Sequence, residues 1–161
     1  MAVQKPLVIV GGQIQQIPAG DTLSAAASEV GVFSKLNANA GALVIGTPVY
    51  ASSATQVDKA AAGAATTARV VGLMQPASTG TGVSGFIQED GILTASTAQW
   101  DAVAGTTGGL AFGVIYYLSA TAGLLTATSP VASGNYSVRV GVALSTTELQ
   151  INVSLDSVLI A

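Results

Sequence analysis

The chain contains no cysteine and no histidine among its 161 residues. These absences exclude disulfides, a thiol nucleophile and thiolate metal ligands, and they also exclude an imidazole base and the commonest zinc and copper ligand. Charge is scarce as well, because only 8% of the residues are charged, against about 25% in a typical soluble domain. The sequence therefore predicts no metal centre.

The few charges limit the partners. The chain has 5 Lys and Arg against 8 Asp and Glu, a net charge of -3. Five cations cannot neutralise the roughly six to ten phosphates of a DNA footprint, so nucleic acid is not expected as a partner. A free monomer usually keeps a charged surface to stay soluble. The charge-poor surface favours a subunit that is covered by copies of itself or by a larger assembly, although some β-rich proteins stay soluble on Ser and Thr hydroxyls alone.

No export or membrane segment is expected. The apolar run Leu7–Val10 is shorter than the roughly 7–15 residues that a signal peptide needs. The stretch Gly109–Ala127 is uncharged and hydrophobic, but it contains three glycines and a Tyr pair, and no cationic cluster flanks it. A strand, a turn and a second strand account for these residues better than a transmembrane helix.

Short apolar runs separated by Gly, Ser, Asn and Thr dominate the chain from Leu36 onwards, which is typical of an all-β barrel or sandwich. Alternation over Tyr136–Val142 and over Leu149–Leu155 predicts strands with one buried face. We therefore expect a mainly β fold, a compact β-barrel or β-sandwich over 36–161, with at most one or two short helices. The expected strands are Ala42–Ile45, Val49–Ala51, Arg69–Met74, Val83–Ile87, Gly91–Ala95, Leu110–Leu118, Leu124–Thr128, Tyr136–Leu144, Leu149–Leu155 and Val158–Ile160.

Residues 1–35 are expected to form an extended N-terminal arm. Pro18–Asp21 has turn chemistry, and Thr22–Val30 could form a short helical turn. Such an arm can reach a neighbouring subunit and add a strand to an exposed sheet edge. The arm residues expected to make assembly contacts are Leu7, Ile9, Ile14, Ile17 and Pro18.

Two stretches have helical character. Ala54–Ala68 is rich in alanine, but Gly63 and a Thr pair weaken it, so a loop with one helical turn fits equally well. Thr97–Val103 is expected to be a helix with Thr97 as its N-cap. Trp100, the only tryptophan, is expected to pack onto the barrel as a core or interface anchor.

A weak internal similarity links two parts of the chain. Gly46–Tyr50 resembles Gly113–Tyr117, and each is followed by a Val-rich segment with one Arg and one Gly, Arg69–Gly72 and Arg139–Val142. Two related β-hairpins in one barrel would produce this similarity, and so would chance recurrence of turn residues.

Three motifs could carry chemistry, and each has a structural explanation. Gly80–Gly85 matches G-x-G-x-x-G, but a strand follows where a dinucleotide site needs a helix. Glu89-Asp90-Gly91 lies between two apolar runs and predicts a hairpin turn. Asp101 with Glu89 or Asp90 is the one remote carboxylate pair that a depolymerase could use. No motif supports catalysis, and we expect neither an enzyme nor a cofactor.

Three separated blocks resemble a pattern found in structural proteins of tailed bacteriophages, namely capsid decoration (cement) proteins and head- or tail-fibre components. The blocks are Gly12–Leu23, Ala40–Tyr50 and Gly113–Thr126, the last followed by Pro130, Gly134-Asn135-Tyr136 and Val140–Ser145. The resemblance covers about two-thirds of the chain, and each block is rich in common residues.

The resemblance implies a β-rich virion protein, often trimeric, with no catalytic residues to carry over. The chain is short for a fibre and lacks a repetitive shaft, which favours a homotrimer that binds the lattice of the major capsid protein. Such a protein would be made in the host bacterial cytoplasm and located on the capsid surface. The alternative is a fibre-associated adhesive module, in which Tyr50, Tyr116 or Tyr117 stacks on a host glycan, although Tyr residues in strands are more often core.

Overall fold

The computed structural model describes residues 7–10, 13–16, 31–75, 79–154 and 158–160. The chain divides into two compact units, Met1–Val30 and Gly31–Ala161. In the first unit, β1 (Leu7–Val10) and β2 (Gln13–Gln16) form an antiparallel hairpin in which Leu7 pairs with Gln16. The predicted helical turn at Thr22–Val30 lies outside the described residues.

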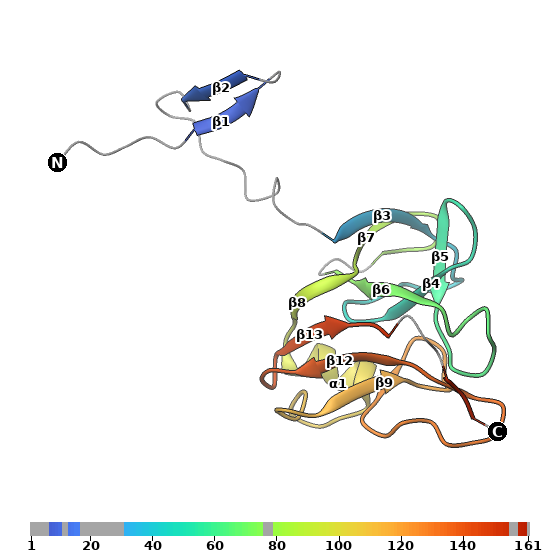
Figure 1. Cartoon of the computed structure of the whole chain (residues 1–161). Helices are drawn as coiled ribbons and strands as arrows, with labels where there is room; N and C mark the ends of the chain where they lie inside the picture. Colours follow the sequence, from blue (N-terminus) through green and yellow to red (C-terminus); the bar gives the residue numbers. More distant parts are fainter. Residues whose placement is uncertain (1–6, 11–12, 17–30, 76–78, 155–157, 161) are drawn as a thin grey trace. The chain divides into compact units, whose positions relative to one another are not determined.

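The second unit begins with a closed barrel in the order β3-β5-β4-β6-β7 (Figure 1). Only the β3–β5 pair is parallel. Because β3 starts at Val32, residues 32–35 belong to this barrel rather than to the predicted arm. The strands are β3 (Val32–Asn37), β4 (Pro48–Ala51), β5 (Gln56–Lys59), β6 (Val70–Met74) and β7 (Ser84–Gln88).

An open antiparallel sheet in the order β10-β9-β12-β13-β8 follows, together with α1 and a short β11–β14 pair. The mainly β fold predicted from the sequence is confirmed, with one helix among the described residues. The elements are β8 (Asp90–Thr94), α1 (Thr97–Ala104), β9 (Ile115–Leu118), β10 (Leu125–Thr126), β11 (Tyr136–Ser137), β12 (Arg139–Ala143), β13 (Glu148–Asn152) and β14 (Val158–Leu159).

The alanine-rich stretch Ala54–Ala68 is not helical, and that alternative is wrong. Its first part is β5, which pairs with β4 through Val57 and Ala51 and with β3 in parallel. Val57 is buried while Gln56 and Asp58 on either side are half-buried, because only alternate side chains face the barrel interior. The alanines that follow are held in a loop, since Ala60 N–H donates to Pro48 O and Ala62 N–H donates to Ser119 O.

The closed barrel and the open sheet have the same strand order. In the barrel, β4 and β5 form a hairpin, β6 pairs with the other side of β4, β7 pairs with β6, and β3 pairs with β7. In the open sheet, β9 takes the place of β4, β10 that of β5, β12 that of β6, β13 that of β7 and β8 that of β3. The internal similarity seen in the sequence therefore extends over two complete five-stranded units.

Equivalent backbone hydrogen bonds support this correspondence. Leu43 N–H donates to Thr79 O over 3.0 Å, as Leu110 N–H donates to Thr146 O over 3.0 Å. Gly46 N–H donates to Met74 O, as Gly113 N–H donates to Ala143 O. Gly46 and Gly113 have φ values of 79° and 76°, which glycine adopts without the cost that a side chain incurs.

A second pair of glycines marks the same bulge in both units. Gly72 and Gly141 each follow a register shift, and they pair with Val49 and Tyr116 respectively. A Cβ at Gly72 would meet the carbonyl oxygen of Gln88, and a Cβ at Gly141 would meet that of Gln150. The neighbouring strand therefore approaches both positions too closely for a larger residue.

The interiors correspond too. The barrel encloses buried side chains of β4, β5, β6, β7 and the loop before β4, with Phe33 and Val71 packed against them. Each has a counterpart in the large buried cluster that the open sheet and α1 form with the outer side of the barrel. The pairs are Leu43 with Leu110, Val49 with Tyr116, Val57 with Leu125, Met74 with Ala143, Ile87 with Leu149, Phe33 with Leu93 and Val71 with Val140.

Helix α1 stands where the closing strand would continue. In the barrel, Leu36 and Asn37 pair with β5, and the register places Ser96 at the position that corresponds to Leu36. Ser96 is the N-cap, and its hydroxyl accepts from Gln99 N–H while the Gln99 side chain accepts from Ser96 N–H. The predicted N-cap, Thr97, is wrong by one residue because only Ser96 completes this capping box.

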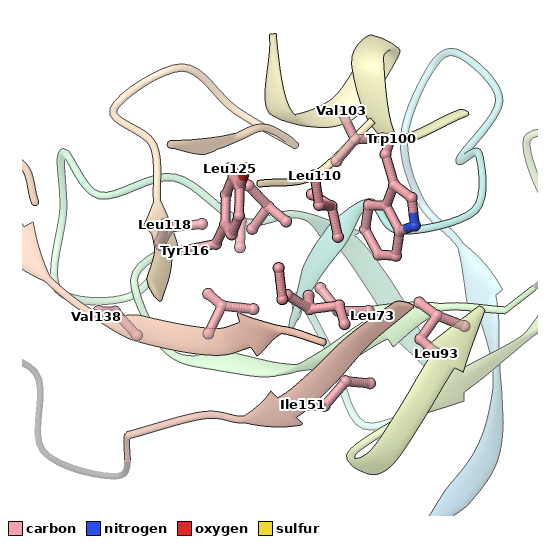
Figure 2. Close-up of a cluster of buried hydrophobic side chains, with 14 of the residues drawn as sticks. Leu73, Leu93, Trp100, Val103, Leu110, Tyr116, Leu118, Leu125, Val138 and Ile151 are labelled. Atoms are coloured by element: carbon pink, nitrogen blue, oxygen red, sulfur yellow. The ribbon is translucent and has the colours of Figure 1, made fainter. Parts of the chain in front are cut away.

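The helix and the barrel fill the concave face of the open sheet. Trp100 and Val103 point from α1 into the largest buried cluster, with Leu73 of β6 at its centre (Figure 2). Gly46 packs against the ring of Trp100. The outer side of the barrel thus supplies part of the core of the second sheet.

The predicted hairpin at Glu89-Asp90-Gly91 is wrong. β7 ends at Gln88 in the barrel and β8 begins at Asp90 in the open sheet, where β8 pairs with β13 (Figure 1). Glu89 N–H donates to Gly31 O over 2.7 Å. Strand β8 leaves the barrel because its hydrophobic partners Leu149 and Ile151 lie on β13.

Candidate assembly surface

The predicted arm contacts fall on two strands and on undescribed residues. Leu7 and Ile9 lie in β1, and Ile14 lies in β2 opposite Ile9. Ile17 and Pro18 lie outside the described residues. The hairpin gives the arm a defined local structure, whereas the sequence led us to expect a single extended segment.

The aromatic residues singled out in the sequence divide into two classes. Trp100 and Tyr116 are fully buried, and Trp100 Nε1 donates to Thr147 O over 3.0 Å. Tyr116 Oη accepts from Ala111 N–H over 3.1 Å. Tyr50 and Tyr117 are half-buried. The two buried rings hold the core together, and a buried Tyr116 cannot stack on a glycan.

Asp101 has a structural role in the loop after α1. Its carboxylate accepts from Gly109 N–H at 2.8 Å, from the Thr106 hydroxyl at 2.9 Å and from Gly108 N–H at 3.0 Å. The Gly109 hydrogen bond above all holds the pKa of Asp101 below its ordinary value, and partial desolvation opposes it. A carboxylate that is occupied and ionised in this way suits loop fixation better than proton transfer.

The glycine-rich segment Gly80–Gly85 also has a structural role. It forms a turn in which Gly82 N–H donates to Asn37 O, and it runs directly into β7. No helix N-terminus follows to hold a pyrophosphate. Among the described residues, no group of three acidic, His or Cys side chains could hold a metal ion.

Large apolar side chains stand exposed on this charge-poor surface. Phe112 is 80% exposed and Phe86 is 60% exposed. Scattered exposed hydrophobic residues are ordinary, but aromatic side chains are enriched at interaction surfaces. The other exposed large hydrophobic residues are Val44, Val83, Ile92, Val131, Val158 and Leu159.

Sequence analysis did not single out Phe86 or Phe112. A signal was present for Phe86, because adjacent Phe86 and Ile87 cannot both face the interior of one strand. Ile87 is fully buried and Phe86 therefore points outward. Phe112 lies in an exposed turn between Ala111 and Gly113, and its loop position carried no such signal.

No known protein family and no curated protein matches this sequence. Within the described part of the chain, no helix is long and apolar enough to cross a membrane. The uncharged stretch Gly109–Ala127 contains the β9–β10 hairpin, as the sequence predicted.

Proposed function

We propose that this protein decorates and stabilises the exterior of a bacteriophage capsid as a homo-oligomer, a trimer around a local three-fold axis. The observation that carries the proposal is the exposure of large apolar side chains, above all Phe112, on a surface with few charges. The phage-like sequence blocks support it, and two of them overlap in the repeat at the corresponding segments Gly46–Tyr50 and Gly113–Tyr117.

Stabilisation by such a protein follows from mass action. A subunit that binds only the assembled lattice stabilises that state by about 2.7 kcal/mol per site when its free concentration is about a hundredfold above Kd. Many weak contacts within an oligomer add avidity, because each further contact is made at a high effective concentration. Apolar side chains and few charges suit such contacts, since little charge must be desolvated.

The arm supplies the second part of the proposed contact. β1 and β2 form a sheet of only two strands, and a two-stranded hairpin by itself is marginally stable in water. Contact with a neighbouring capsid or decoration subunit would stabilise it.

Removal of residues 1–20 tests this proposal. We expect the truncated protein to keep the melting temperature of the β domain and to lose binding to capsid shells of the phage that encodes it. Co-sedimentation with shells measures binding, and a variant with Gln13→Ser and Gln15→Ser serves as a full-length control. Truncated protein that coats the shells at full occupancy would contradict the role of the arm, and absence of the protein from purified virions would contradict the function.

A further inference from the structure

The same row of residues is covered in the barrel and uncovered in the open sheet. Across the barrel the pairing register aligns Pro48, Leu73, Gln88 and Val32. Leu73 is 0% exposed, Gln88 is 9% exposed and Pro48 is buried, while Val32 at the end of the row is half-buried.

The corresponding row of the open sheet is Ile115, Val142, Gln150 and Ile92. Ile115 and Val142 are only half-buried, Gln150 is exposed, and Ile92 is 52% exposed. Equivalent rows of the barrel and the open sheet thus differ in how far their side chains are exposed.

The loop before the hairpin shows the largest difference. Ile45 precedes Gly46 in the barrel and is 5% exposed, whereas its counterpart Phe112 precedes Gly113 and is the most exposed large hydrophobic residue described. A larger, aromatic side chain therefore stands in water at the position where the barrel buries an isoleucine.

The cover of the barrel row is a second unit of the same kind. Leu73 and Ile45 belong to the same buried cluster as three residues of the other five-stranded unit. These are Trp100 of α1, Leu93 of β8 and Ile151 of β13. We propose that the outer face of the open sheet, formed by Phe112, Ile115, Val142, Gln150 and Ile92, packs against a second copy of this chain. This inference rests on the proposed function and names the contact between its subunits.

The charges around this face fit a contact with an identical copy. None of the five residues is charged, and charged side chains of both signs lie at its margin on the same side of the sheet, Arg139 beside Tyr117, Glu148 beside Thr94 and Asp90 beside Asn152. Arg139 Nε is buried and has no hydrogen-bond partner among the described atoms. In a trimer each subunit presents this face to a different surface of the next copy, and a margin with charges of both signs can pair with charges of either sign on that surface.

Replacement of Phe112 tests the inference. Phe112→Ser should weaken self-association by about tenfold or more, because truncation of a central aromatic residue has effects of that size. The matched control is Phe86→Ser, which removes an equally aromatic, exposed side chain from β7 of the barrel. Light scattering after size exclusion measures the mass, and thermal melting checks that both variants fold. Equal association of Phe112→Ser and the wild type would overturn the inference, and so would a wild type that stays monomeric up to about 1 mM.

Cysteine labelling gives an independent readout, since the chain has no cysteine. Phe112→Cys should react with a maleimide more slowly in concentrated than in dilute protein, while Phe86→Cys should react equally in both. Equal rates at position 112 at both concentrations would contradict the contact.

Shell binding separates this inference from the proposed function. If Phe112→Ser keeps the wild-type mass but loses shell binding, the face contacts the capsid lattice, and the inference is wrong while the function stands. If Phe112→Ser dissociates and neither protein is found on virions, the inference stands and the function fails.

Discussion

The closed barrel and the open sheet differ at one decisive place. Both have the same strand order and equivalent hydrogen bonds, but β3 continues into its pairing with β5, while β8 gives way to α1. The closing pair is replaced by a helix whose Trp100 fills the opened interior. The capping box of Ser96 and Gln99 begins this helix at the point where the barrel continues its strand.

The largest effect is expected from Trp100→Ala. Loss of a fully buried tryptophan costs about 3–5 kcal/mol in the free energy of unfolding, and urea unfolding followed by circular dichroism measures it. Hydrogen exchange should accelerate more at β9 and β12 than at β4 and β5, because the barrel interior contains no part of Trp100. Trp100→Phe is the control and should cost less. Equal acceleration in both units would show that α1 does not specifically support the open sheet.

Substitution of the two bulge glycines tests whether the closed barrel tolerates an added side chain less well than the open sheet does. Gly72→Ala and Gly141→Ala each force a Cβ against a carbonyl oxygen of the next strand, which should cost roughly 1–3 kcal/mol. Gly72→Ala should cost more, because Gly72 also has a φ of 154°, which residues with a side chain rarely adopt, and because a closed barrel cannot widen at one strand while an open sheet can. Chemical denaturation of both variants gives the comparison, and a larger loss for Gly141→Ala would contradict this explanation.

The capping box can be tested at its first residue. Ser96→Ala should destabilise the protein by about 1 kcal/mol, since it leaves the Gln99 N–H without its side-chain acceptor. Thr97→Ala is the neighbouring control and should change the free energy of unfolding by less than about 0.5 kcal/mol, as expected of a substitution away from special features. If Thr97→Ala costs more than Ser96→Ala, the helix begins one residue later than described.

The smallest effect concerns the loop that Asp101 fixes. Because folding lowers the pKa of Asp101, its stabilisation is fully present above the unfolded value of about 3.9 and is lost as pH falls through the lower folded value. Asp101→Asn should therefore lower Tm at neutral pH, and the difference from wild type should shrink below about pH 4. Thermal melts across this pH range provide the measurement. A difference that does not change with pH would mean that carboxylate ionisation contributes nothing.

Local patterns predicted the strands that obey strict alternation. In β13, Leu149 and Ile151 are buried while Gln150 and Asn152 are exposed. In the predicted alternation over Tyr136–Val142, the expected buried face held for Val138 and Val140 but not for Val142, because a bulge near Gly141 shifts the phase. One extra residue in a bulge is enough to break the alternation of inward and outward side chains on which the sequence prediction relied.

Non-local pairing was beyond the sequence patterns. Strand β5 holds one buried apolar residue, Val57, and its parallel partner β3 resembled part of a polar arm. The Asp90-Gly91 pair carries the same local signal whether the chain reverses or passes to another sheet. The internal repeat was visible only in its glycines and tyrosines, since counterparts such as Val49 and Tyr116 share burial rather than identity.

Leu73 has a consequence for the ancestry of the chain. Leu73 projects from the barrel into a cluster whose other residues come largely from the open sheet and α1. A protein made of residues 31–88 alone would therefore expose Leu73 to water. Duplication of a gene for such a unit would have joined two units with exposed hydrophobic surfaces in one polypeptide. Deletion of either unit would then expose the hydrophobic surface of the other and make it prone to aggregate.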